Sequence, residues 1–155
     1  MIGRVALAVA LLPIAGAASA QAAGECGEWT SARNIPEPWA DNTATYADGA
    51  IRVTRLDTLE PAAAAVHLMI LSPPLDELGD RSCTVVSQTA ATDGWPGGFS
   101  AIDFASRTAS YSPETGLVLS LPVEVFDPAT GGGQRRVLRV TVDQTRGVSA
   151  TMPAP

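Results

Sequence analysis

Leu117-Val-Leu-Ser-Leu-Pro-Val-Glu-Val125 and Leu138-Arg-Val-Thr-Val142 are the two stretches that decide the fold of this chain. Apolar residues occupy every second position in both stretches. Successive side chains of a β-strand point to opposite faces, so this alternation predicts two strands that each bury one face. A turn sequence that ends in glycine precedes the first stretch (Ser112–Gly116), and another follows the second (Asp143–Gly147). Such sequences are common in hairpin loops, and we therefore predict a four-strand meander over residues 99–152.

The middle of the chain contains further strand signals. Ile51 and Val53 alternate with polar residues, as in a half-buried strand. Residues 62–71 include a continuous apolar run, which fits either a short buried helix or a central strand. We favour the strand, because Ser72-Pro73-Pro74 ends the run after about eight residues.

The number of short strands indicates the fold class. About seven or eight strands separated by turn signals, with no long helical period, predict an all-β domain over residues 49–152. Its strands should be antiparallel and form either a single β-sandwich or a small β-barrel. Residues 21–48 are predicted to be an irregular segment lying across the domain, and residues 153–155 a short tail. Turn-forming residues cluster over 73–82 and 93–98, which are predicted to be loops.

The first twenty residues have the three parts of a secretory signal peptide. One arginine supplies a positive charge, residues 5–17 are apolar, and Ala18-Ser19-Ala20 has the small residues that a signal peptidase recognises. We predict a signal peptide over residues 1–20, with cleavage between Ala20 and Gln21. The apolar run is too short for a membrane-spanning helix, so we expect no stable membrane insertion. The expected location is the periplasm, with secretion from the cell as the alternative.

Cys26 and Cys83 are the two cysteines of the chain. Only one intramolecular pairing is available, and export favours its oxidation. We therefore predict a disulfide that ties the irregular N-terminal segment to the domain. That segment contains Trp29, Trp39 and Tyr46, and we expect these aromatic side chains to cover the core.

Charge and composition exclude several classes of partner and chemistry. The chain has 16 acidic and 10 basic residues and a net charge of −6. Nucleic-acid binding needs dense basic charge at the phosphates, so we expect no nucleic-acid partner. All basic residues are arginine, which removes lysine Schiff-base chemistry and a P-loop lysine. The lack of lysine and of Asn-x-Ser/Thr sites is typical of a bacterial chain.

No group of residues in the sequence suggests a catalytic, cofactor or metal site. His67 is the single histidine and lies within the apolar run, so we interpret it as a structural residue with one hydrogen bond. Its alternative role would be that of a general base. Asp76, Glu77 and Asp80 lie together but lack the EF-hand spacing, and one histidine does not supply the usual zinc ligands. We expect no cofactor and favour a non-enzymatic role, although an enzyme stays open.

Five exposed or loop residues are the candidate contact surface: Trp95, Asp76, Glu77, Arg135 and Arg139. The tryptophan fits two roles, a lid over the open end of the sheet or a contact for a sugar, peptide or protein. We expect a binding or envelope-accessory module whose partner is a protein or small ligand of the cell envelope. The alternatives are an inhibitor of a periplasmic or secreted hydrolase and a lipocalin-like carrier of a small apolar ligand.

Overall fold

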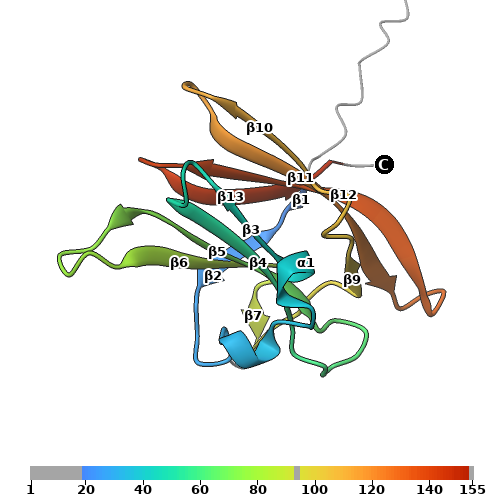
Figure 1. Cartoon of the computed structure of the whole chain (residues 1–155). Helices are drawn as coiled ribbons and strands as arrows, with labels where there is room; N and C mark the ends of the chain where they lie inside the picture. Colours follow the sequence, from blue (N-terminus) through green and yellow to red (C-terminus); the bar gives the residue numbers. More distant parts are fainter. Residues whose placement is uncertain (1–18, 93–94, 154–155) are drawn as a thin grey trace, which may run out of the picture.

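Two antiparallel sheets face each other in the computed structural model, which describes residues 19–92 and 95–153 (Figure 1). The strands are β1 (Ser19–Ala20), β2 (Ala22–Glu25), β3 (Thr43–Tyr46), β4 (Ile51–Asp57), β5 (Val66–Leu75), β6 (Arg81–Ser87), β7 (Ala91–Thr92), β8 (Trp95–Pro96), β9 (Ala101–Ile102), β10 (Thr108–Ser112), β11 (Gly116–Asp127), β12 (Gly132–Asp143) and β13 (Gly147–Met152). Sheet A has the order β1-β13-β12-β11-β10, with β9 also paired to β11. Sheet B has the order β2-β6-β5-β4-β3, and β7 and β8 form a separate hairpin.

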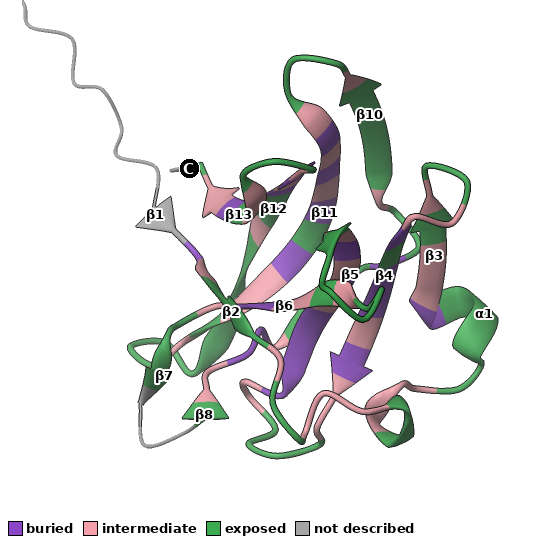
Figure 2. Ribbon diagram, turned by 90° about the vertical axis from the view of Figure 1, so that its left-hand side faces the viewer, coloured by how far each residue is buried: buried purple, intermediate pink, exposed green. Residues whose placement is uncertain are grey.

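The inner faces of the two sheets form one apolar core (Figure 2). On β11 the buried positions are alternate residues from Leu117 to Val123, and β12 contributes Leu138, Val140 and Val142. Sheet B contributes Ile51, Val53, Val66, Leu68, Ile70 and Val86, and the segment between β8 and β10, which includes β9, contributes Phe99, Ile102 and Phe104. The apolar residues at every second position of the sequence are therefore the ones on the buried face of each sheet.

The meander predicted from the sequence is confirmed. The strands β10, β11, β12 and β13 are neighbours in sheet A, and each pair is antiparallel. Both predicted turns close hairpins, with Ser112 paired to Gly116 and Asp143 paired to Gly147. The two glycines have φ angles of 75° and 81°, a region that residues with a Cβ rarely adopt.

The all-β class is confirmed in the form of a sandwich. Sheets A and B are separate, and over residues 19–92 and 95–153 the edge strands β10 and β3 do not pair with each other, as closure into a barrel would require. Seven strands have five residues or more, as expected: β4, β5, β6, β10, β11, β12 and β13. Two of them, β11 and β12, have 12 residues each and are longer than predicted. The remaining strands have two to four residues, too few for a recognisable alternation.

Residues 21–48, predicted to be irregular, contain two strands of sheet B. At the start of the segment β2 pairs with β6, and at its end β3 pairs with β4. The one-turn elements η1 (Ala32–Asn34) and α1 (Trp39–Asn42) lie between them. Each strand has four residues, so its structure depends on pairing with the neighbouring strand rather than on a pattern of its own. The prediction is therefore wrong at both ends of the segment.

The strand interpretation of residues 62–71 is confirmed from Val66 onward. This strand, β5, is the central strand of sheet B, with β4 on one side and β6 on the other. Its residues Val66, Leu68 and Ile70 are buried in the core between the sheets.

The predicted loop over residues 73–82 is wrong at both ends, because the chain turns only between Leu75 and Arg81. The register of β5 against β6 shifts between Ser72 and Leu75. Proline has no N–H to donate to a neighbouring strand, and such an irregularity accommodates Pro73 and Pro74 within a strand. The proline pair therefore does not end the strand as predicted.

The predicted disulfide between Cys26 and Cys83 is present, with a Cα–Cα separation of 5.5 Å. Cys26 follows β2 directly, and Cys83 lies in the middle of β6. The bond therefore fastens the N-terminal segment to sheet B at the point where the segment leaves the sheet.

Residues 1–18 of the predicted signal peptide lie outside the described residues. Ser19 and Ala20 form β1, which pairs with Thr151 and Met152. The N–H of Gln21 donates to the carbonyl of Ala150 at 3.0 Å, so the predicted cleavage point lies where the chain passes from β1 of sheet A to β2 of sheet B. Within the described ranges, no helix has the length and apolar character required to cross a bilayer.

Candidate functional site

Three aromatic rings from separate segments contact one another in a row, with their planes tilted by 56° and 32°, and we name this row the aromatic stack. The ring centres of Trp29 and His67 are 4.7 Å apart, and those of Trp29 and Trp95 are 5.7 Å apart. Trp29 follows β2, His67 lies on β5 and Trp95 lies on β8. This aromatic stack therefore joins the N-terminal segment, sheet B and the β7–β8 hairpin.

His67 forms the inner end of the aromatic stack. Its neighbours Val66 and Leu68 face the core, so strand alternation directs His67 to the opposite face of sheet B. The side chain is 2% exposed, and its Nδ1 lies 2.8 Å from the Oγ of Ser87 on β6. Burial lowers the pKa of His67 to about 4, and the nearby carboxylate of Asp57 opposes that shift only in part. His67 is therefore neutral near pH 7, with the contacts of a structural histidine.

Trp29 is held in place by the chain on both sides. Upstream, Cys26 is bonded to β6 through the disulfide. Downstream, the Nδ2 of Asn34 donates to the Trp29 carbonyl at 2.6 Å, and the Ser31 N–H donates to the same oxygen at 2.9 Å. These contacts fix the backbone of Trp29 and so direct its ring over His67.

Trp95 forms the outer end of the aromatic stack. It is 57% exposed and pairs with Thr92 across the β7–β8 hairpin. The interpretation of Trp95 as a buried lid over the sheet is wrong, because Trp95 covers Trp29 and leaves more than half of its own surface in solvent. Its exposed indole is available for a contact.

Gly98 allows the β7–β8 hairpin to approach sheet B closely. Its N–H donates to the Ala64 carbonyl at 2.8 Å. A Cβ on this residue would lie 2.6 Å from the Ala64 oxygen and 2.8 Å from the His67 Nε2. Both distances are shorter than any side chain tolerates, so this position requires glycine to bring Trp95 over Trp29.

A cavity of about 480 Å³ opens beside the aromatic stack. We name it the aromatic cavity, and its lining residues are Trp29, Arg33, Asn34, Thr58, Glu60, Pro61, His67, Trp95 and Pro96. Arg33 and Glu60 bring opposite charges to it, and neither forms an ion pair within the described part of the chain. The cavity therefore combines flat apolar walls with the charged groups of Arg33 and Glu60, and beside them lies the Asn34 amide, whose Nδ2 also donates to the Trp29 carbonyl.

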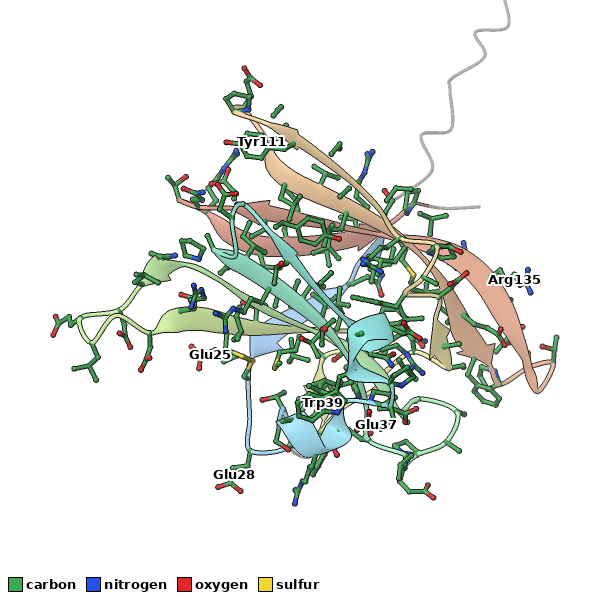
Figure 3. All side chains as sticks on the ribbon, in the orientation of Figure 1. Glu25, Glu28, Glu37, Trp39, Tyr111 and Arg135 are labelled. Atoms are coloured by element: carbon green, nitrogen blue, oxygen red, sulfur yellow. A yellow bond between two sulfur atoms is a disulfide. The ribbon has the colours of Figure 1, made fainter. Side chains whose placement is uncertain are left out.

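The other two aromatic residues of the N-terminal segment differ in their environment. Tyr46 packs against the core, as expected. The ring of Trp39 on α1 is half exposed and does not cover the core, contrary to the prediction (Figure 3). The helix α1 directly precedes β3, the edge strand of sheet B, and contacts both β3 and β4.

The remaining candidate contact residues lie in two places, both away from Trp95: Asp76 and Glu77 on one turn, and Arg135 and Arg139 on β12. Asp76 and Glu77 lie on the β5–β6 turn at the far left of Figure 1, whereas Arg135 lies on β12 at the opposite side of the molecule in Figure 3. Arg139 lines a separate surface cavity of about 630 Å³ on sheet A, together with Asp143 and Arg146. The five residues therefore do not form one surface, and Trp95 alone belongs to the aromatic cavity.

Asp76 has a local structural contact. Its Oδ1 accepts hydrogen bonds from the N–H groups of Leu78 and Asp80, both at 2.9 Å, which stabilises the turn. Among residues 19–92 and 95–153, no group of three or more His, Cys, Asp or Glu side chains is arranged to hold a metal ion.

Comparison of the chain with protein-family models, with curated proteins and with solved structures finds no match. The class defined by the structure is a two-sheet antiparallel β-sandwich with one disulfide. Functional inference therefore depends on the geometry of the aromatic cavity.

The buried neutral state of His67 predicts a loss of stability in mild acid. The unfolded chain takes up a proton near pH 6.5, whereas folded His67 does so only near pH 4. The contribution of His67 to the free energy of unfolding is thus fully present above pH 6.5. It decreases as the pH drops from 6.5 towards 4. The expected loss is about 3 kcal/mol in the free energy of unfolding, measured by urea denaturation at a series of pH values.

The control for this prediction is the His67→Gln variant, which keeps a polar side chain but cannot be protonated. Asp103, Asp127 and Asp143 have pKa values below the ordinary range because hydrogen bonds favour their carboxylates, and they also destabilise the fold in acid. These carboxylates act equally in both proteins, so the difference between the two curves reports His67. Parallel curves for the two proteins would contradict the prediction.

Proposed function

We propose that this chain is a non-enzymatic binding module of the bacterial envelope and that the aromatic cavity is its recognition site. The periplasm is the proposed location, with release from the cell as the alternative, and the disulfide is compatible with both because it persists in an oxidising compartment. Binding pockets combine flat apolar surfaces with a few polar groups that fix the ligand's orientation, and the aromatic cavity has both. The position of exposed Trp95 over Trp29 carries the proposal.

The chemistry of the cavity favours a neutral saccharide. One face of a sugar ring presents C–H groups that pack on an indole, while its hydroxyl groups bond to charged and amide side chains. The exposed face of Trp95 provides the surface for the sugar C–H groups, and Arg33, Asn34 and Glu60 provide the hydrogen-bonding groups for its hydroxyls. The charges of Arg33 and Glu60 offset each other, so the cavity has no preference for a strongly anionic or cationic ligand. A purely apolar ligand would leave these polar groups without partners.

Removal of the exposed indole should weaken saccharide binding. We expect at least one neutral oligosaccharide, from a panel of N-acetylglucosamine oligomers, maltotriose and cellotriose, to bind the wild-type protein at one site. Trp95→Ala should lower the affinity about tenfold, because the stacking contact is lost. Isothermal titration calorimetry measures both constants.

Trp39→Ala is the matched control, since Trp39 is 50% exposed but does not line the aromatic cavity. This variant should bind like the wild-type protein. The proposal is contradicted if no member of the panel binds, or if Trp95→Ala and Trp39→Ala reduce the affinity equally.

A second candidate function is inhibition of a secreted hydrolase through the β5–β6 turn. Leu78 is 89% exposed at this turn, so its apolar side chain is accessible to a partner. The turn is held by Asp76, whose N–H donates to the Asp80 carbonyl at 2.8 Å and whose carboxylate accepts two further hydrogen bonds. A protruding, preorganised loop suits insertion into an active site. Assays against lysozyme and envelope proteases test this function, and a lack of inhibition at micromolar protein would contradict it.

The carrier alternative receives less support. A lipocalin-like carrier requires a closed barrel with an open interior, whereas β10 and β3 are edge strands of two separate sheets. Side chains of both sheets fill the space between them, and Leu119, Leu121 and Leu138 have no exposed surface.

A further inference from the structure

The edge of sheet A at β10 has one side without a partner strand. β10 pairs with β11 over all five of its residues, from Thr108 to Ser112, and is the last strand of the sheet. On the other side, the backbone groups of β10 pair with no strand within the described part of the chain. Such an edge is a template for an additional strand.

The strand β10 contains no charge, proline or bulge, three of the features that protect natural edge strands. Natural edge strands are blunted by charged side chains, proline or bulges. The sequence Thr108-Ala-Ser-Tyr-Ser112 contains no charge and no proline, and its register against β11 is continuous. Its first four residues are exposed to solvent. Nothing in this strand therefore opposes the approach of another strand.

The inner face of β10 extends beyond the cover of sheet B. Ala109 and Tyr111 pair with Leu119 and Leu117, so their side chains point to the same side as the core. Tyr111 is nevertheless 68% exposed, as its position on the projecting β10–β11 hairpin shows (Figure 3). A cavity of about 480 Å³ opens beneath it and is also lined by Tyr46 of β3. The core side of this hairpin is thus partly uncovered.

We propose that a second copy of this chain pairs with β10, so that two β10 strands form an antiparallel ladder across a two-fold axis at Ser110. In this register Ser110 faces the same residue of the second copy, Ala109 faces Tyr111, and Thr108 faces Ser112. The sequence numbers of two paired residues differ by zero, two or four. The backbone N–H and C=O groups of every second residue in a strand point to the same side. The outward-pointing groups of one copy therefore face the outward-pointing groups of the other.

The side chains of β10 complement one another in this register. The large ring of Tyr111 lies opposite the small Ala109 on the core side, and both copies make this contact. Thr108, Ser110 and Ser112 form a row of hydroxyl groups on the other side, where cross-strand Thr–Ser hydrogen bonds are favourable. No like charges oppose each other, because the strand carries none.

The two neighbouring symmetric registers fit less well. An axis at Ala109 would place Arg107 opposite Tyr111, although Arg107 already donates to the Tyr46 hydroxyl at 3.1 Å within its own chain. An axis at Tyr111 would place Pro113 opposite Ala109, and proline cannot donate to the ladder. The sequence around β10 therefore favours the axis at Ser110.

Sedimentation equilibrium of the full chain tests the proposal. The mass of the wild-type protein should approach twice the monomer mass as its concentration is raised to about 100 μM. This range detects an interface of moderate affinity. Ser110→Lys places two ammonium groups next to each other on the axis and should raise the dissociation constant at least about tenfold. Ser149→Lys is the matched control, an exposed serine on β13, and should leave the dimer intact.

A cysteine at the axis tests the register itself. Directly opposite residues have Cα atoms about 4.5–5.5 Å apart, within the range that a disulfide bridges. Ser110→Cys should therefore form a covalent dimer on mild oxidation, and Ser149→Cys should not. A monomeric wild-type protein, or a Ser110→Lys variant that stays dimeric, would overturn the proposal. A Ser110→Cys variant that forms no cross-link would overturn the proposed register. Circular dichroism confirms that each variant is folded.

Discussion

Replacement of both cysteines by serine is expected to lower the free energy of unfolding by about 4 kcal/mol. The disulfide joins residues separated by 57 positions, so the intact bond removes much conformational freedom from the unfolded chain. It also fixes Cys26, three residues before Trp29, and thus supports the aromatic stack. Urea denaturation of the wild-type protein and the Cys26→Ser/Cys83→Ser variant measures the change.

Reduction of the wild-type protein is the natural control. A reductant should lower the stability of the wild-type protein to that of the double variant and leave the double variant unchanged. If the two proteins unfold at the same urea concentration without reductant, the disulfide does not stabilise the fold by the expected amount. A loss of saccharide binding in the double variant would additionally link the disulfide to the position of Trp29.

Replacement of Phe99 by alanine is expected to cost about 3 to 5 kcal/mol. Phe99 has no exposed surface and lies in the core between the sheets. Its backbone bridges to Val66 through two hydrogen bonds of 2.7 and 3.0 Å, so the residue links β5 to the segment that enters sheet A. The truncated side chain would leave a cavity that well-packed neighbours fill only in part.

Phe126→Ala is the matched control for this variant. Phe126 is 38% exposed on β11, and its truncation should cost about 1 kcal/mol or less. Equal losses for the two variants would show that Phe99 does not occupy the tightly packed position described above. Thermal and urea unfolding of both proteins provide the comparison.

The parts of the fold that sequence could predict are those with local signals. The alternation from Leu117 to Val125 spans enough residues to identify a strand, and Gly116 and Gly147 mark turns that need a positive φ. The strands β2 and β3 have no such signal, because four residues in an edge strand are too few to show a period. Their existence depends on the strands next to them.

The candidate site could be predicted only in part. Trp95 stands out in the sequence because it lies in a turn cluster, where a large apolar residue is unusual. Trp29, Arg33 and Glu60 are recognised as its neighbours only in the fold, because the cavity assembles three segments that are distant along the chain. The proximity of Trp29 to Cys26 was the available signal, since a disulfide next to a tryptophan limits where its ring can lie.

Asp76 shows why a charged residue was a poor guide to the site, and Asp143, which was not a candidate, has the same kind of contact. Both carboxylates accept hydrogen bonds from backbone N–H groups of their own turns, so these side chains stabilise local structure. A sequence cannot distinguish an acidic residue with this role from one that contacts a ligand.

The strand β10 lies near the top of Figure 1, whereas the β7–β8 hairpin, whose Trp95 lines the aromatic cavity, lies near the bottom. An assembly through β10 would therefore hold two recognition sites apart and leave both accessible. A polymer with repeating units could engage both sites at once, and its avidity would then exceed the affinity of either site alone. Weak recognition of a single unit would be sufficient for firm attachment to a polymeric surface.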